Sequence, residues 1–297
     1  MLSAQPTSGP EIIDLQGEAL AVQPVQSWVW QVSHPRSMHV SYIYGILYQV
    51  PEDYFFLPPG LDEYIAQADR LVMEVDPSTD DQEFIHRGST PIDSTLEHLL
   101  PLRDYPDVWA FLQDSLSPVA RYKLSQRYYP LLLSRQINCD YCLGHRRGTP
   151  LVSYEWYLYD AINKPLKVLN TGWTRTAWLD AYTFREQALE LAESIRQRQP
   201  ACETYWAMLR AYRRQDLDKV WLLAQDAPDL GDNMGRFIEA RNVAWVRSLQ
   251  YTLQLENLFI AVNAVQLPGE YGLLHQLRKA GFVVTPVQWT PTHSQHE

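Results

Sequence analysis

The stretch LFIAVNAVQLPGEYGLL, residues 258–274, decides the fold of this chain. Residues 258–265 are apolar apart from one asparagine, which is typical of a strand buried on both faces. The segment GLLHQLRKA, residues 272–280, then has the spacing of an amphipathic helix, and Gly281 ends it. Because the apolar run FVVTPVQ follows directly, this end of the chain has the strand, helix, strand order of an α/β fold.

A second unit of this kind lies near the start of the chain. WVWQVS (28–33) and HVSYIYG (39–45) are rich in β-branched and aromatic residues, and the His-Pro-Arg-Ser between them suits a hairpin. A Pro-Pro-Gly turn, the amphipathic helix LDEYIAQAD and the apolar run RLVMEVD (70–76) follow. In sheets built from such units, functional side chains gather at the carboxyl ends of the strands.

We expect one α/β domain, a mixed β-sheet flanked by helices, over residues 27–290. Residues 1–26 are polar and aperiodic, so they are typical of a flexible leader, and residues 291–297 form a short flexible tail. A helical insert is expected at about 91–165, where the capping-box pattern STLE begins a Leu- and Tyr-rich region broken by prolines. Its aromatic side chains either fill a core or line a groove for a partner. Further elements are expected at the strand LKVLN and at helices near 180–199, 201–214 and 235–255.

The composition argues against two classes of function. A formal net charge of −10 over 297 residues leaves no overall basic surface, so nucleic-acid binding is not expected. No stretch approaches the roughly 20 apolar residues of a membrane span, and the start MLSAQPTSGPEIIDLQGEAL lacks the pattern of a signal peptide. We therefore expect a cytoplasmic protein with no membrane span. A periplasmic or secreted location is the alternative if a signal peptide precedes this Met1.

Three cysteines are too few for a disulfide scaffold. Cys139, Cys142 and His145 have a C-x2-C-x2-H spacing that could supply half of a zinc site, but no fourth ligand is evident. Because the flanking segment has a helical pattern, the favoured interpretation is two thiols on one side of a helical turn.

One or both of two acidic residues at the end of an apolar run should be functional or paired. Glu74 and Asp76 are two residues apart, so a strand would place them on one face. A buried carboxylate normally meets a cation, a metal or backbone donors. The candidate cation is Arg241, which lies beside the apolar stripe of the helix RFIEARNVAWVRSL. The alternative is an arginine whose stem lies along the helix edge with its charge in water.

These segments resemble a known family over residues 28–288. YIYGILY, LPPGLDEYIAQAD and LVMEVD are similar to the opening pattern of the TraB/GumN family, whose relatives include the Tiki proteases: a strand ending in Gly-Thr-Ile-His, a proline-rich turn, a helix and a strand with Glu. ARNVAWV, LFIAVNAVQ and LPGEYGLL resemble its closing pattern, an Arg-Asn helix, an apolar strand, a second Gly-x-x-His and Leu-Pro-Gly-Glu-x-Gly. LRAYRRQDLDKVW resembles its Tyr-x-x-Gly-Asp segment.

The resemblance implies metal-assisted hydrolysis in the active members, with the two Gly-x-x-His motifs as the metal site. Here the two histidine positions carry Tyr48 and Gln266, and the second glycine position carries Asn263. The family's other Gly, Glu and Arg positions are retained as Gly45, Glu74 and Arg241. A phenol stays protonated at neutral pH and a carboxamide oxygen is a weak ligand, so the two exchanges together should abolish tight metal binding.

We therefore expect a catalytically inactive or strongly altered relative that needs no cofactor. Its vestigial site would consist of Tyr48, Glu74, Arg241 and Gln266. The surrounding pocket would include Gly45, Asp76, Asn242, Asn263 and Glu270. Such a site could bind a small molecule, a peptide or a protein.

Two other classes of function stay open at this point. The first is a working peptidase or esterase that holds a divalent cation such as Mn, Zn or Co with Glu74, Asp76 and Glu270. The second is a scaffold protein that binds a partner through the aromatic insert, residues 91–165.

Overall fold

The computed structural model describes residues 27–78, 94–115, 129–144, 150–170, 182–225 and 234–288. Its centre is a six-stranded sheet with the strand order β6-β4-β7-β2-β1-β8. The strands, in that order, are Leu166–Val168, Arg70–Met73, Leu258–Asn263, Val40–Ile46, Val29–Ser33 and Val283–Pro286.

The sheet is mixed, as the sequence predicts. Strands β6, β4, β7 and β2 are parallel neighbours, whereas β1 is antiparallel to both β2 and β8. The register places Gly45 beside Val262 and Met73 beside Ala261, so the expected strands end side by side. We call the edge at which β2, β4, β6 and β7 end the carboxyl edge, and the opposite edge the amino edge.

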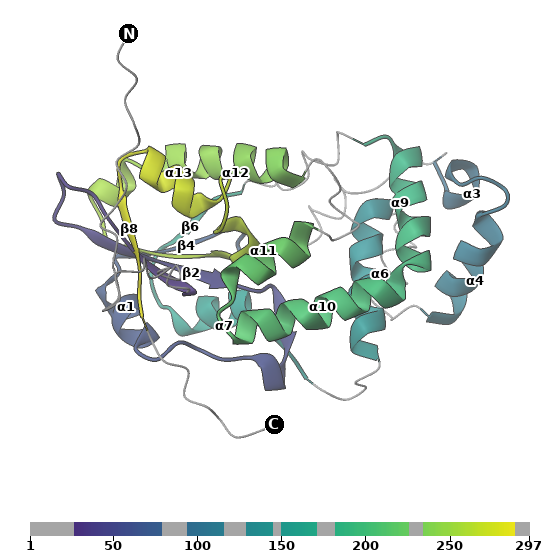
Figure 1. Cartoon of the computed structure of the whole chain (residues 1–297), viewed down its shortest axis with the longest axis horizontal. Coiled ribbons are helices and arrows are strands. Elements are labelled where there is room, and N and C mark those ends of the chain that lie inside the picture. Colours follow the sequence, from purple (N-terminus) through teal and green to yellow (C-terminus); the bar gives the residue numbers. More distant parts are fainter. Residues whose placement is uncertain are drawn as a thin grey trace, which may run out of the picture.

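Helices cover both faces of the sheet (Figure 1). Helices α12 (Met234–Leu249) and α13 (Leu273–Lys279) lie on one face, and α1 (Leu61–Gln67) and α7 (Tyr154–Ala161) lie on the other. The central strand β7 is buried from Leu258 to Val262, which is why its sequence is an unbroken apolar run. The main core therefore encloses the sheet from both sides.

A group of helices beside the sheet has a small apolar core of its own. It contains α3 (Leu96–Leu99), α4 (Tyr105–Ser115), α6 (Pro130–Gly144) and α9 (Phe184–Arg196). Figure 1 shows these helices at one end of the molecule, joined to the sheet by α10, Arg198–Arg213. Their buried side chains are Leu100, Val108, Leu112, Leu133, Ala188, Leu191, Ala192 and Ile195.

This helical group overlaps the expected insert only in part. Helix α9 follows residue 165, whereas α7 lies inside the expected range and yet contributes Tyr154 and Leu158 to the main core. A two-stranded sheet of β3 (Gln49–Pro51) and β5 (Leu151–Ser153) joins the last part of that range to the chain after β2.

Two local predictions are wrong. The STLE pattern forms no capping box, because the N-cap of α3 is Thr95, whose hydroxyl lies 2.9 Å from Nδ1 of His98 instead. A capping box is present at α9, between Thr183 and Glu186. The strand predicted over 70–76 ends at Met73, so Glu74 lies in the following bend and Asp76 lies beyond it. The argument that they share a strand face therefore does not apply.

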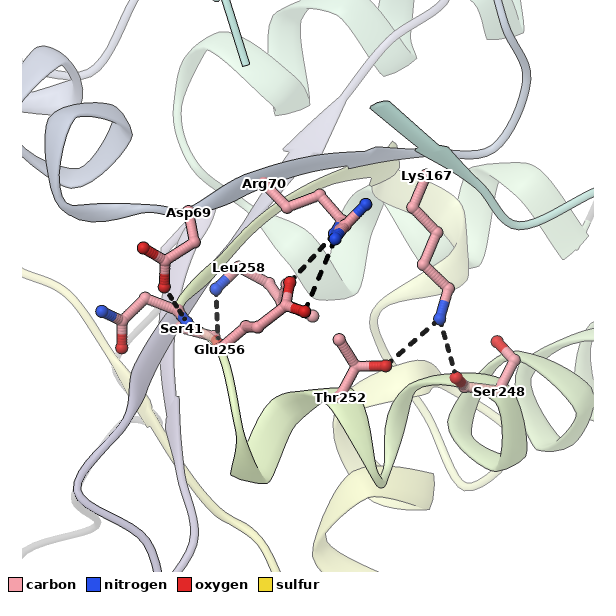
Figure 2. A network of polar contacts seen from close by, with 9 residues as sticks. Ser41, Asp69, Arg70, Lys167, Ser248, Thr252, Glu256 and Leu258 are labelled. Carbon is pink, nitrogen blue, oxygen red and sulfur yellow. Dashed lines mark hydrogen bonds and ion pairs between the residues drawn. The ribbon is translucent and has the colours of Figure 1, made fainter. Parts of the chain in front are cut away.

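Polar side chains at the amino edge form hydrogen bonds and an ion pair that connect the strands to the preceding segments (Figure 2). Arg70 Nε lies 2.9 Å from Glu256 Oε2, and the Asp69 carboxylate accepts the backbone N–H of Asn257. Ser41 Oγ accepts the N–H of Leu258, the first residue of β7. Lys167 donates to the Ser248 carbonyl and to Thr252, which satisfies acceptors at the end of α12. Each of these side chains thus binds the backbone or a partner of opposite charge.

The 3-10 helices and the remaining α-helix complete the description of the chain. Short 3-10 turns follow β3, α12 and β7, and α11 connects α10 with the region before α12. Their bounds are Glu52–Tyr54 (η1), Thr252–Gln254 (η4), Ala264–Gln266 (η5) and Leu217–Gln225 (α11).

Candidate functional site

Glu74 is the first residue after β4, and both of its carboxylate oxygens are engaged. Oε1 accepts the backbone N–H of Asn263 at 2.7 Å, and Oε2 lies 3.6 Å from Nη1 of Arg241. The side chains are 12% and 17% exposed, so the pair is largely withdrawn from water. The expected ion pair between Glu74 and Arg241 is therefore present, and the carboxylate also extends the β4–β7 pairing beyond the last strand residue.

A second layer of contacts supports this ion pair. The guanidinium carbon of Arg241 lies 5.8 Å from the ring centre of Trp245, one turn further along α12. The indole N–H of Trp245 donates to Asn170 Oδ1 at 2.9 Å, and the Asn170 N–H donates to the carbonyl of Glu74. Asn170 was not among the predicted site residues, although its place directly after the β6 segment was a signal.

Asn263 and Gln266 have different roles at the end of β7. The Asn263 side-chain oxygen accepts the N–H of Val265 at 3.0 Å and so caps the 3-10 turn η5. A glycine, as in the family pattern, could not form this cap. Gln266 is only 5% exposed, and its Oε1 accepts no hydrogen bond from any described residue. Position 266 therefore carries a buried amide.

Asn242 joins α12 to the turn after β7. It is fully buried, and its Nδ2 donates to the carbonyl oxygens of Gln266 at 3.1 Å and Tyr271 at 2.9 Å. Its Oδ1, like Gln266 Oε1, has no donor among the described residues. A buried acceptor without a donor costs about 1–3 kcal/mol, so the carboxyl edge contains two unfavourable positions on contacting residues.

Gly45 is enclosed at the end of β2. A Cβ atom there would lie 2.6 Å from Leu267 Cδ1 and 3.3 Å from the Trp28 ring, so only glycine fits without displacing its neighbours. The Gly45 carbonyl accepts a 2.8 Å hydrogen bond from Tyr212, whose ring stacks on Trp28. Burial raises the pKa of the Tyr212 phenol well above its ordinary value.

Tyr212 was missed as a contact of the site, although it lies in the Tyr-x-x-Gly-Asp-like segment. Tyr48 follows β2 and is 61% exposed. Tyr48 and Gln266 thus differ in environment, since Tyr48 lies at the surface and Gln266 is buried.

Two of the expected pocket residues take part in local contacts. Asp76 Oδ1 accepts from the N–H and the hydroxyl of Ser78, which makes a local turn. Glu270 is exposed, and its carbonyl rather than its carboxylate is used, as an acceptor for Gln276. Among the residues that the structure describes, no three His, Cys, Asp or Glu side chains gather closely enough to hold a metal ion.

The cysteine cluster is described only in part. Cys142 is buried in α6, as is Cys202 in α10. The side chain of Cys139 and the whole of His145 lie outside the described residues. The structure therefore gives a helix for the two-residue spacing but no geometry for a zinc site.

Comparisons with known proteins identify the family of the chain. Within the described part of the chain, no helix combines the length and apolarity that a bilayer crossing requires. The chain has no match among curated proteins or among solved structures. The model of the TraB/PrgY/gumN family matches residues 28–286, which include every strand of the sheet and the whole carboxyl edge. The chain therefore belongs to the TraB/PrgY/gumN family.

Proposed function

We propose that this protein is a catalytically silent member of its family, and that its carboxyl edge serves as a polar site that binds a ligand. The observation that carries the proposal is the state of Glu74. One carboxylate oxygen accepts the Asn263 N–H and the other faces Arg241, so the family's acidic position contributes to the structure of the sheet edge. Both contacts stabilise the ionised carboxylate, which makes it a weaker general base.

The side chains at the histidine positions support the same conclusion. Tyr48 offers a neutral phenol at the surface, and Gln266 offers a buried carboxamide oxygen. Mn, Zn and Co bind neutral imidazole well, whereas phenol and carboxamide are weak ligands at neutral pH. The residues present therefore do not fit the metal that the resemblance implies, and we derive no hydrolytic step through it.

Metal titration of restored variants tests this proposal. Four proteins are compared by calorimetry and elemental analysis after purification without chelator: the wild type, Tyr48→His, Gln266→His, and both changes together. The wild type and the single variants should hold no stoichiometric Mn, Zn or Co at micromolar metal, since one imidazole does not define a site. The double variant should gain measurable affinity, because Glu74, Gln266 and Tyr48 follow the three neighbouring strands β4, β7 and β2.

The third exchange can be added to the same series. Asn263→Gly restores the glycine position but removes the cap that Asn263 provides for η5, so it is measured in the double background. Stoichiometric metal in the wild type, with metal-dependent hydrolysis of peptides or esters, would show that the protein is a working hydrolase with other ligands.

A further inference from the structure

The amino edge of the sheet is basic, although the chain as a whole has a formal net charge of −10. This edge consists of the β1–β2 hairpin and of the segments that lead from a helix into β4, β6, β7 and β8. The segments are 34–39, 64–70, 158–167, 246–257 and 276–282. Together they contain seven Lys or Arg but only three Asp or Glu, so one edge of an acidic protein has a positive charge.

Contacts within the edge leave the positive charge facing solvent. Two of the three acidic side chains are engaged: Glu256 pairs with Arg70 at 2.9 Å, and Asp69 accepts the backbone N–H of Asn257 (Figure 2). The third acidic residue, Asp160, is exposed. Three basic side chains are exposed at the same edge, namely Arg36, Arg247 and Lys279.

Large apolar side chains protrude beside these basic residues. Met38 in the hairpin is 98% exposed, and Tyr251 and Leu255 around the 3-10 turn η4 are 73% and 53% exposed. The two segments touch, because Ser37 Oγ donates to the Gln254 carbonyl at 2.9 Å. Apolar side chains gathered at the surface among basic ones are typical of proteins that bind a membrane interface.

The degree of exposure and the sign of the charge select the partner. A protein partner is normally bound through a continuous, closely packed apolar centre, whereas Met38 is surrounded by solvent on nearly every side. A bilayer interface accepts separate side chains: Met and Leu reach the acyl boundary, and the Tyr phenol stays among the headgroups. Anionic headgroups match the basic side chains and attract this edge in preference to the acidic remainder of the protein.

We propose that the amino edge binds the surface of an anionic lipid bilayer. Met38, Tyr251 and Leu255 enter the interface, while Arg36, Arg247 and Lys279 contact lipid phosphates. The parallel strands run from this edge to the carboxyl edge, so the bound protein presents Glu74 and Arg241 to the aqueous phase, about 20 Å from the bilayer surface. The inference concerns a different edge from the proposed function and does not depend on it.

Sedimentation with sucrose-loaded vesicles tests the proposal on the full chain. One set of vesicles is phosphatidylcholine alone, and the other contains about 30% phosphatidylglycerol as the anionic lipid. The wild type should bind the anionic vesicles at least about fiftyfold more tightly than the neutral ones, since each basic residue at the surface contributes about fivefold. Raising the salt from about 0.1 M to about 1 M should remove most of this preference, because the charges are then screened.

Two variants with the same total charge separate the amino edge from the protein as a whole. The first neutralises the edge with Arg36→Gln, Arg247→Gln and Lys279→Gln. The second neutralises three exposed basic residues on α9, α10 and α11 with Arg185→Gln, Arg210→Gln and Lys219→Gln. Affinity for anionic vesicles should fall at least about twentyfold in the first variant and stay within about threefold of wild type in the second.

The apolar contribution has its own pair of variants. Met38→Gln with Leu255→Gln should lower vesicle affinity about tenfold at both salt concentrations. Leu102 and Leu222 are also exposed, at 89% and 48%, but lie on other parts of the molecule, so Leu102→Gln with Leu222→Gln should leave the affinity within twofold of wild type. Poly-glutamate serves as a soluble anionic probe without an apolar phase, and it should bind at least tenfold more weakly than the anionic vesicles.

Equal binding to neutral and anionic vesicles, no binding to either, or equal losses in the two charge variants overturns the inference. Poly-glutamate binding as tight as vesicle binding, with no effect of the changes at Met38 and Leu255, would assign the edge to an acidic protein instead. Circular dichroism melts check that each variant is folded, and the two vesicle types and the salt series use the wild type. None of these readouts involves metal or hydrolysis, so their failure leaves the proposed function unaffected.

Discussion

The two edges of the sheet use polar residues in different ways. At the amino edge, Asp69 and Ser41 accept backbone N–H groups, and Arg70 and Glu256 pair with each other (Figure 2). At the carboxyl edge, Glu74 both accepts a backbone N–H group and pairs with an arginine. The side-chain oxygens of Asn242 and Gln266 have no donor among the described residues. The side chains at the amino edge are thus paired, whereas the carboxyl edge retains two buried oxygens without a donor among the described residues.

The ion pairs at the two edges also differ, in both distance and burial. Arg70 and Glu256 are 2.9 Å apart and each about one-third exposed, whereas Arg241 and Glu74 are 3.6 Å apart and much less exposed. Distance alone would rank the amino-edge pair as the stronger. Burial reverses this order, because water screens the exposed pair, and loss of one partner in the enclosed pair leaves a charge without compensation.

The largest effect is expected from Gly272→Ala at the carboxyl edge. A Cβ atom on Gly272 would lie 2.1 Å from the Pro268 carbonyl oxygen and 2.3 Å from that of Leu267, so the turn after β7 has to rebuild. We expect a loss of more than about 4 kcal/mol in the free energy of unfolding, measured in urea.

Gly281→Ala near the amino edge is the control for this change. Gly281 has a φ of +90°, but the nearest atom to an added Cβ, His34 Nε2, is 4.0 Å away. Only backbone strain of about 1–2 kcal/mol is expected there. A similar loss in the two variants would show that the turn after β7 adapts as easily as an open loop.

Arg241→Met should cost about 2–4 kcal/mol, because it leaves the Glu74 carboxylate largely buried without its cation. Arg70→Met should cost less than about 1 kcal/mol, since the Glu256 carboxylate can be hydrated. Both variants keep an apolar stem of similar length, and urea unfolding of the pair measures the difference. If the two losses were equal, burial would not distinguish the edges.

Alkaline pH tests the tyrosines that pack against β2. Burial raises the pKa of Tyr154 to about 12, and those of Tyr44 and Tyr212 rise well above the ordinary value. A raised pKa means that the folded state keeps its proton longer, so this contribution to stability is complete below pH 10 and is lost as the pH rises toward 12 and above.

Tyr154→Phe should therefore lose about 2 kcal/mol less stability than the wild type between pH 10 and 12. Its stability at pH 7 falls separately, because the phenol also bonds Phe56. Chemical unfolding at pH 7, 10 and 12 separates the two effects. Parallel losses in both proteins would mean that Tyr154 ionises normally in the folded state.

The smallest effect is expected at Gln215, three residues after Tyr212. Its φ of 60° is in the left-handed region, which glycine adopts more easily than other residues. Gln215→Gly should stabilise the protein by about 0.5 kcal/mol, since relief of strain exceeds the added freedom of the unfolded chain. A loss of stability in a thermal scan would show that the buried Gln215 side chain contributes more than its backbone costs.

The sequence predicted the parts of the site that lie on long periodic segments. Buried strands and α12 have strong hydrophobic patterns, so the places of Gly45, Glu74 and Arg241 followed from their own segments. The ion pair followed because a carboxylate beside an apolar run needs a cation.

The contacts that join distant segments could not be predicted in the same way. The Tyr212 hydroxyl reaches Gly45 across 167 residues, and Glu74 reaches the Asn263 N–H across 189. Such contacts depend on strand register and side-chain rotamer, which no local pattern contains. The strand end after Met73 was also missed, since an apolar pattern does not show where pairing stops.

The place of β7 has a consequence for the synthesis of this protein. β7 lies between β4 and β2 and pairs Leu258 with Arg70, yet it is among the last strands to be translated. Until β7 has left the ribosome, the β1–β2 hairpin and the β4–β6 pair have open inner edges with no strand to join them. A nascent chain with such open edges is prone to aggregate, and a stop codon before β7 would release a fragment that cannot complete its sheet.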